Sequence, residues 1–157
     1  MIRRIKSDDR GELIEIISRI TEFSDEEKQV AIELIDESIN ADREGYYITF
    51  VQTKNDTVAG YYCIGKRALT DGVYDLYWIV VDPLFQGMGI GKKLLEHAEK
   101  YVEVHKGRWL LAETSSKESY AKTRNFYIRN HYTKVAEIND FYSMNDHLII
   151  FGKYLTT

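Results

Sequence analysis

Hydrophobic positions in the first part of the chain follow a helical spacing. Residues 10–20 carry apolar side chains three and four positions apart, as one face of a helix requires. The next segment opens with Ser24 and Glu27, a pair typical of a capping box at a helix start. We therefore predict a short strand at 1–6 and two helices, at 10–20 and 24–40.

The middle of the chain changes to strand-like patterning. Three runs rich in Tyr, Val and Ile are separated by turn residues, at 55–56 and 71–72. Short turns of this kind join antiparallel neighbours, so we predict an antiparallel meander of strands at 46–54, 58–68 and 73–82.

An amphipathic helix and a further strand come next. The apolar side chains within 94–102 share one helical face, which predicts a helix over 90–104, and the run at 108–115 reads as a strand. Strand, helix, strand is a crossover unit, so the strands at 73–82 and 108–115 should be parallel neighbours.

A short helix at about 117–130 and two closing strands, at 132–138 and 146–154, complete the pattern. The predicted fold class is α/β of the α+β kind. It has a mixed, mostly antiparallel central sheet of about seven strands, flanked by about four helices.

Composition is that of an ordinary globular protein. The chain has 157 residues, 44% of them hydrophobic and 29% charged, and no linker divides it, so we expect a single domain over 1–157. Neither a signal peptide nor an apolar run of about 18 residues is visible. These features predict a cytoplasmic protein that does not enter a membrane.

Charge and cysteine content exclude two further classes. The net charge of −4 argues against a general nucleic-acid binder, which would show a basic excess. Cys63 is the only cysteine, so no intramolecular disulfide can form and a cysteine-rich metal site is excluded. Its apolar neighbours predict a buried, unreactive thiol.

Three glycines alternate along 86–91, between a predicted strand and a predicted helix. Glycine permits positive φ, so consecutive N–H groups can point into one concavity at a helix N-terminus, where the helix dipole adds partial positive charge. Such a loop is suited to phosphate. Its spacing matches neither the dinucleotide-binding pattern G-x-G-x-x-G nor the nucleotide-triphosphate pattern G-x-x-x-x-G-K-[ST].

What remains is Gln86-x-x-Gly89-x-Gly91, after a strand that ends in Val-Asp-Pro. In this pattern the chain resembles the GNAT superfamily of acyl-CoA-dependent N-acyltransferases, whose loop cradles the pyrophosphate of coenzyme A. The likeness extends to Tyr127 in RNFYIRNHY, at the place of the family's general acid, and to the closing segment EINDFYSMNDHLIIFGKYL. The resemblance implies an N-acetyltransferase that moves an acetyl group from acetyl-CoA to a primary amine of a small molecule, by direct attack in a ternary complex.

Two alternatives stay open. The acceptor could be a protein lysine or N-terminus, or the chain could be a non-catalytic sensor that binds acyl-CoA. An intact loop together with Tyr127 favours catalysis over sensing. The family is frequently dimeric, so a homodimer is an expectation by analogy.

The resemblance also implies which residues hold the coenzyme. The loop backbone would bind the pyrophosphate, and Lys92, Lys93 or Arg124 would meet the remaining phosphate unless they are only solvated. The fourth and fifth strands would splay apart, leaving an edge for the pantetheine amides and making the Val81 N–H the oxyanion donor. The implied binding residues are Ile79, Val80, Val81, Gln86, Gly87, Met88, Gly89, Ile90, Gly91 and Lys92.

Two protons must be managed in such a reaction. Tyr127, with an ordinary pKa of about 10, would protonate the leaving thiolate. Glu113 would deprotonate the acceptor ammonium, with Asp75 or water as alternatives. After this tyrosine the family commonly has a glycine before an aromatic residue. Here the glycine is missing, and Asn130 or His131 is expected to take the left-handed conformation instead.

Histidines and acceptor residues give weaker signals. His97, His105 and His147 are expected at the surface, and their spacing fits no metal site, so no metal is expected. The acceptor pocket implied by the resemblance involves residues 20–45 with Tyr74, Tyr77 and Trp78. Acidic residues within 25–44 would suit a cationic amine or form only a solvated helix face.

Overall fold

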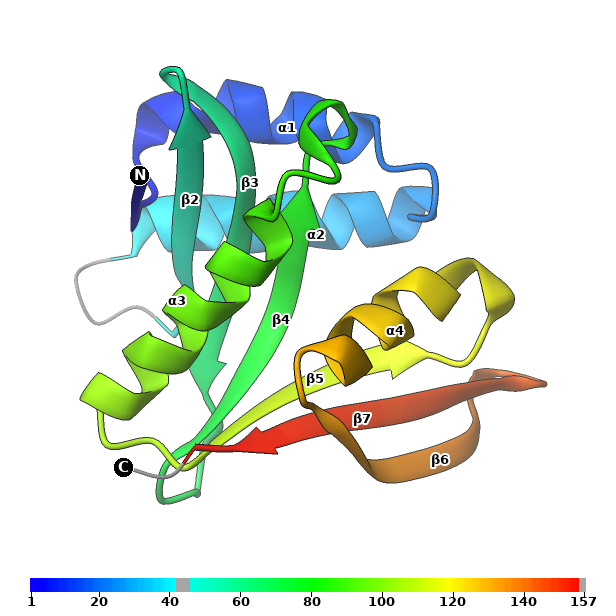
Figure 1. The fold of residues 1–157 in the computed structure, drawn as a ribbon. Coiled ribbons are helices and arrows are strands. Elements are labelled where there is room, and N and C mark those ends of the chain that lie inside the picture. The colour runs from blue at the N-terminus through cyan, green and yellow to red at the C-terminus, as the bar shows by residue number, and fades with distance from the viewer. Residues whose placement is uncertain (42–45, 156–157) are drawn as a thin grey trace. The chain divides into compact units, whose positions relative to one another are not determined.

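The computed structural model describes residues 1–41 and 46–155. Its helices and strands follow the predicted order (Figure 1). They are β1 (Ile2–Arg4), α1 (Arg10–Ser18), α2 (Asp25–Asn40), β2 (Ile48–Lys54), β3 (Thr57–Lys66), β4 (Val73–Val81), α3 (Ile90–Val104), β5 (Trp109–Ser115), α4 (Ala121–Arg129), β6 (Thr133–Ser143) and β7 (Asp146–Tyr154). Among the described residues, no helix is long and apolar enough to cross a membrane.

The seven strands form one mixed sheet in the order β1-β2-β3-β4-β5-β7-β6. β4 and β5 pair in parallel, as the crossover predicted, and β2 pairs with β3 antiparallel, as the meander predicted. The parallel register runs from Val73 opposite Trp109 to Leu76 opposite Ala112. Both strands continue beyond this register, β4 to Val81 and β5 to Ser115. The predicted fold class is confirmed.

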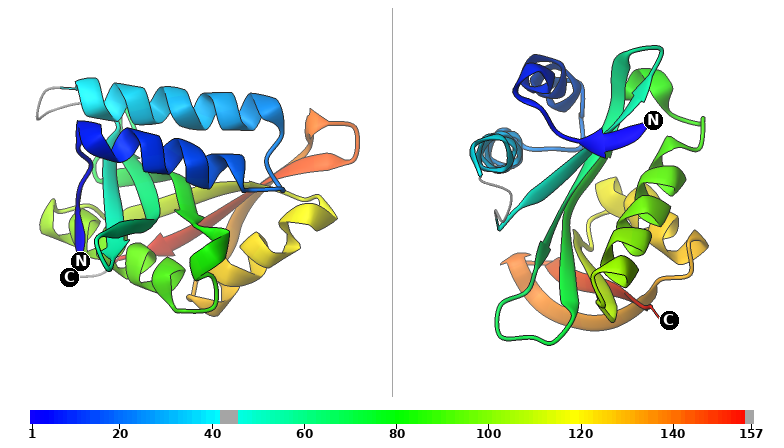
Figure 2. Two further views of the ribbon diagram at one scale, coloured as in Figure 1. Left: turned by 90° about the horizontal axis from the view of Figure 1, so that it is seen from above. Right: turned by 90° about the vertical axis from the view of Figure 1, so that its left-hand side faces the viewer.

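The chain forms two compact units. The first comprises residues 1–65 and 77–100. In it, α1 and α2 cover one face of β2 and β3, and α3 covers the other (Figure 2). The helical stripes predicted from the sequence supply the core on the α1 and α2 face, which contains Leu13, Ile16, Ile17, Ile20, Ala31, Ile35, Val51, Val58, Tyr61 and Val80.

On the α3 face, Gly60 in β3 sets how closely the helix approaches. A Cβ added at Gly60 would lie 2.7 Å from the Val80 carbonyl oxygen and 3.1 Å from the Leu94 side chain. Real Cβ atoms do not come that close to backbone, so α3 packs against a position that has room only for hydrogen.

The second unit comprises residues 66–76 and 101–157. Here α4 packs on β7, with the rings of Tyr127 and Phe151 stacked 5.7 Å apart. β6 is the outer strand, and it extends to Ser143 although the sequence predicted an end at residue 138. All eleven residues of β6 are exposed, so neither face selects apolar side chains and the period-two signal that marks a half-buried strand is absent.

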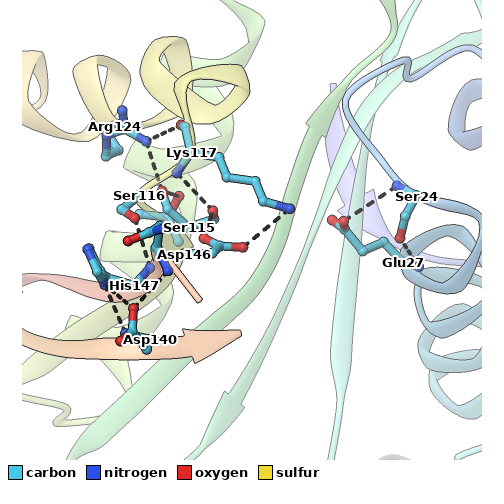
Figure 3. Close-up of polar contacts among 11 residues, drawn as sticks. Ser24, Glu27, Ser115, Ser116, Lys117, Arg124, Asp140, Asp146 and His147 are labelled. Carbon is cyan, nitrogen blue, oxygen red and sulfur yellow. Dashed lines mark hydrogen bonds and ion pairs between the residues drawn. The ribbon is translucent and has the colours of Figure 1, made fainter. Parts of the chain in front are cut away.

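Two local predictions in the first unit are confirmed. The Ser24 hydroxyl accepts the Glu27 N–H at 3.1 Å, and the Glu27 carboxylate accepts the Ser24 N–H at 3.4 Å, which completes the capping box (Figure 3). Cys63 is buried, and burial raises the pKa of its thiol to about 11. A thiol with that pKa is almost wholly protonated at neutral pH and is a poor nucleophile.

The expectation that His97 lies at the surface is wrong. His97 projects from α3 onto β3, where its Nδ1 lies 2.8 Å from the Tyr62 hydroxyl. The ring of Phe50 also packs against it, at 4.9 Å between centroids. Burial lowers the pKa of His97, because the imidazolium loses hydration there.

Adjacent tyrosines in β3 provide a test of this core. The Tyr61 hydroxyl is buried and has no hydrogen-bond partner within the described part of the chain, whereas the Tyr62 hydroxyl has His97. Removing an unpaired buried hydroxyl relieves a desolvation penalty, so Tyr61→Phe should raise the free energy of unfolding by about 1 kcal/mol. Tyr62→Phe should lower it by about 1 kcal/mol. Urea denaturation of both variants checks this, and a loss of stability in Tyr61→Phe would mean that its hydroxyl is bonded.

Candidate functional site

The glycine loop lies between the end of β4 and the start of α3, in the first unit. Gly87 and Gly89 have φ values of 78° and 74°, the left-handed region in which only glycine is unstrained. Gly91 lies inside α3, which begins at Ile90, so only two of the three glycines serve the turn. An added Cβ at Gly87 or Gly89 would meet no atom within 4 Å, so backbone conformation alone requires glycine there.

Asp82 fixes the chain as it enters this loop. Its carboxylate accepts the Leu84 N–H at 3.0 Å and lies 2.8 Å from Nη1 of Arg19 on the segment after α1. Its own N–H donates to the Ala59 carbonyl at 2.9 Å. The residue is only 2% exposed. We did not predict this role from the sequence, although the Asp-Pro pair at a strand end is a signal for a turn.

The loop backbone is open to solvent. Residues 86–89 are exposed, while the side chain of Ile90 is buried and holds the first turn of α3 in place. Of the neighbouring lysines, Lys54 lies 3.1 Å from the Met88 sulfur and Lys92 lies 3.7 Å from Glu96. An exposed turn at the N-terminus of the 15-residue helix α3 is a suitable place for an anion.

The last residues of β4 differ in burial and in the direction of their N–H groups. Val80 is buried in the first unit's core, and Ile79 and Val81 are half-buried. Consecutive N–H groups of an extended strand point to opposite edges. Because the Asp82 N–H bonds to β3, those of Ile79 and Val81 are directed to the other edge of β4. This is the orientation that the predicted role of Val81 requires.

Tyr127 lies on α4, in the second unit, and is 4% exposed. Its ring packs among Phe126, Tyr132 and Phe151, and this burial raises the pKa of its hydroxyl well above the ordinary value. At neutral pH the residue is therefore a phenol, able to donate a hydrogen bond.

The end of α4 resolves an alternative from the sequence. His131, with φ of 68°, takes the left-handed conformation. The Tyr132 N–H then donates to the Tyr127 carbonyl at 3.0 Å, and the His131 N–H to the Ile128 carbonyl at 3.1 Å. These two bonds are the Schellman pattern, normally closed by glycine, and the 5.6 Å contact of the Tyr127 and Tyr132 rings accompanies them.

Both candidate bases lie beside one arginine in the second unit. Asp75 is buried, and one of its carboxylate oxygens accepts two hydrogen bonds from Arg67, at 2.7 and 3.2 Å. Glu113, at the end of β5, has a side chain 47% exposed and lies 3.6 Å from the same guanidinium. Glu113 is therefore the more accessible of the two carboxylates.

The remaining basic candidates have partners or lie in solvent. Arg124 donates from Nη1 to the carbonyls of Ser115 and Lys117, at 2.8 and 2.6 Å, which the sequence did not predict. Lys92 and Lys93 are exposed. Among residues 1–41 and 46–155, no three or more His, Cys, Asp or Glu side chains are grouped as a metal site would require.

The aromatic acceptor candidates are distributed over the two units. Trp78 packs edge-on against Phe23 at 5.0 Å, and Tyr77 against Tyr47 at 5.0 Å, both in the first unit. Tyr74 is buried in the second unit against Tyr101. Of the acidic segment, Asp36 pairs with Arg10 and Glu27 is part of the capping box. Asp42 and Glu44 lie outside the described residues.

Comparisons with known proteins identify the family of this chain. A model of the acetyltransferase (GNAT) domain matches residues 45–134. Comparison with curated protein sequences gives no match. A crystal structure of a protein assigned to the GNAT acetyltransferases, from Desulfovibrio desulfuricans, is 36% identical over 99% of both chains, with a TM-score of 0.94. The chain therefore belongs to the GNAT acetyltransferase family, a family of enzymes.

More distant structures share the fold. The ribosomal-protein-S18-alanine N-acetyltransferase from Escherichia coli is 21% identical, with a TM-score of 0.77 over 100% of this chain and 94% of that one. An aminoglycoside 6'-N-acetyltransferase complexed with coenzyme A is 15% identical, with a TM-score of 0.75 over 100% of this chain and 98% of that one.

A matched pair of glycines tests the loop. Gly89 and Gly11 both have open space around a built Cβ, but only Gly89 has a positive φ. Gly89→Ala should therefore lower the free energy of unfolding by about 1 kcal/mol. Gly11→Ala, within α1, should raise it by up to about 1 kcal/mol. Denaturant unfolding measures both, and equal effects of the two substitutions would contradict a strained loop.

Proposed function

We propose that this acetyltransferase transfers an acetyl group from acetyl-CoA to the primary amine of a small molecule, by direct attack in a ternary complex. The observation that carries the proposal is the exposed turn at Gly87 and Gly89, held open in front of α3. Its N–H groups, from Gly87 to Lys92, bind the pyrophosphate of the coenzyme, and Gln86 shapes the turn. Such sites hold phosphate through backbone rather than through side chains.

The thioester needs an oxyanion donor. The N–H of Val81 fills this role in the proposal, since it is directed to the edge of β4 away from β3. The pantetheine amides add along the same edge at Ile79 and Val81, as an extra strand would. A fixed backbone donor costs no reorganisation when negative charge develops on the carbonyl oxygen.

Tyr127 is the proposed general acid. Its buried hydroxyl keeps its proton at neutral pH and can donate a hydrogen bond to the departing sulfur. A phenol with a raised pKa is a weak acid toward an ordinary thiolate, whose conjugate acid has a pKa of about 8.5. Complete transfer therefore requires a thiolate whose own basicity is raised by loss of water as it forms.

Glu113 is the proposed base, acting directly or through water. Asp75 has the weaker claim, because two hydrogen bonds from Arg67 stabilise its carboxylate and burial restricts access to it. The acceptor amine is largely an ammonium at neutral pH and must lose a proton before it attacks. An exposed carboxylate at a strand end can reach such a group.

The fold is compatible with acceptors of very different size. The distant structures that share the fold include one protein N-acetyltransferase and one aminoglycoside N-acetyltransferase, so the fold itself does not choose between a protein and a small molecule. Tyr77 and Trp78 are our acceptor candidates. A cytoplasmic location and a homodimer stay predictions.

Thiol release from acetyl-CoA across a panel of small amines tests the activity. Wild type should turn over with at least one amine. Tyr127→Phe should lower kcat by about 100-fold, because the general acid is lost, while coenzyme binding measured by calorimetry stays unchanged. Gly89→Glu should abolish coenzyme binding, because it places a side chain and a negative charge in the turn.

Other results would redirect the proposal. Coenzyme binding without release for any small amine, but with release for peptide amines, would favour a protein acceptor. Binding that is lost in Gly89→Glu without turnover on any amine would indicate a sensor. No binding of coenzyme at all would refute the assigned loop.

The two carboxylates can be separated by matched amides. Glu113→Gln should lower kcat about 100-fold at neutral pH. It should also regain part of the loss at high pH, where the amine is already neutral. Asp75→Asn should instead lower stability, since it replaces the buried, charged partner of Arg67 with a neutral amide. The pH–rate profile and thermal unfolding of both variants check this, and a pH-independent loss in Glu113→Gln argues for another base.

A further inference from the structure

The junction between β5 and α4 is held by a chain of polar contacts in the second unit (Figure 3). The Lys117 N–H donates to the Ser115 hydroxyl oxygen at 3.0 Å, and that hydroxyl donates in turn to a carboxylate oxygen of Asp146 at the start of β7. A second link joins the same two segments. Ser116 N–H donates to the His147 carbonyl at 3.0 Å, and the His147 N–H donates to the Ser116 hydroxyl at 2.8 Å.

Asp146 determines which groups donate and which accept in this series of hydrogen bonds. An ionised carboxylate only accepts hydrogen bonds, so it fixes the Ser115 hydroxyl as a donor and leaves the serine oxygen to accept from Lys117. Asp146 is 4% exposed, and its counter-charge, the Lys117 ammonium, lies 3.4 Å away. A buried carboxylate is costly to desolvate, so its presence at a plain strand connection needs an explanation.

Arg124 connects α4 to the same junction by hydrogen bonds. It lies one turn inside the helix and donates to the carbonyls of Ser115 and Lys117, the two residues that the Asp146 chain already orients. The junction between β5 and α4 is thus held by two sets of hydrogen bonds, one from Arg124 of α4 and one through Ser115 to Asp146. Tyr127 follows Arg124 by three positions, and Glu113 precedes Ser115 by two.

We propose that Asp146, Ser115 and Arg124 are positioning residues that set Tyr127 relative to Glu113 for acetyl transfer. The inference rests on the proposed function of those two residues. Asp146 acts on Tyr127 and Glu113 through the Ser115 hydroxyl and the junction backbone. Catalysis is sensitive to such placement, since a displacement of about 1 Å can cost about 100-fold in rate.

Ser115→Ala is the primary test, because it removes one hydroxyl and leaves the backbone in place. We expect kcat to fall about 10- to 100-fold with an unchanged KM for acetyl-CoA. Ser115→Thr keeps the hydroxyl and should restore most of the rate. Ser119→Ala, at an exposed serine in the turn before α4, is the matched control and should behave as wild type.

Two readouts separate positioning from a general loss of structure. Hydrogen exchange of α4 amides should accelerate in Ser115→Ala, while exchange in α3 stays unchanged. In the Tyr127→Phe background, Ser115→Ala should cost about threefold or less, because residues that act through one another are not additive. Asp146→Asn, which keeps an acceptor oxygen, should give a smaller loss than Ser115→Ala.

Unchanged exchange in α4 would overturn the proposal, as would rate losses that multiply fully with Tyr127→Phe. A Ser115→Thr variant that folds but remains as slow as Ser115→Ala would exclude the hydroxyl as the link. If wild type transfers no acetyl group to any amine, the proposed function fails instead. The exchange experiment then still decides whether this network holds α4.

Discussion

The buried carboxylate of Asp82 is the interaction on which the proposed phosphate-binding loop of this protein depends. It joins the end of β4 to Arg19 and to the turn before the glycine loop, and hydrogen bonds to a charged group of this kind contribute about 1.5–3 kcal/mol each. Because these bonds fix the residues just before the loop, Gly87 and Gly89 can hold their positive φ without contacts from other side chains. The exposed turn that we propose as an anion site thus follows a buried residue whose N–H and carboxylate oxygens are hydrogen-bonded.

The second unit uses the same principle at another strand end. There Asp146 is buried and bonded to a serine that orients the following turn, much as Asp82 orients Leu84. In both cases a carboxylate outside the proposed chemistry supports a segment that takes part in it. Tyr127 adds a structural role of its own, since its carbonyl accepts the hydrogen bond that ends α4. A phenylalanine retains that bond and the ring contacts, so the hydroxyl can be studied separately.

Local signals in the sequence predicted most of the fold. The helical stripes of α1 and α3, the Ser24 capping box and the crossover between β4 and β5 each depend on residues close in the chain. Features that join distant residues were missed. Asp82 meets Arg19 across 63 positions, Ser115 meets Asp146 across 31, and His97 meets Tyr62 across 35. The glycine loop was found because its requirement is local, whereas its supports are not.

Gly60, in β3, influences the position of the glycine loop although it lies outside that loop. α3 begins at the glycine loop and packs over Gly60, where even a methyl group would press on the backbone of β4. Substitution there could not be absorbed by a flexible side chain, so the helix would have to move, and its first turn with it. The position of the loop therefore depends on a glycine in β3, under the helix, as well as on the glycines within the loop itself.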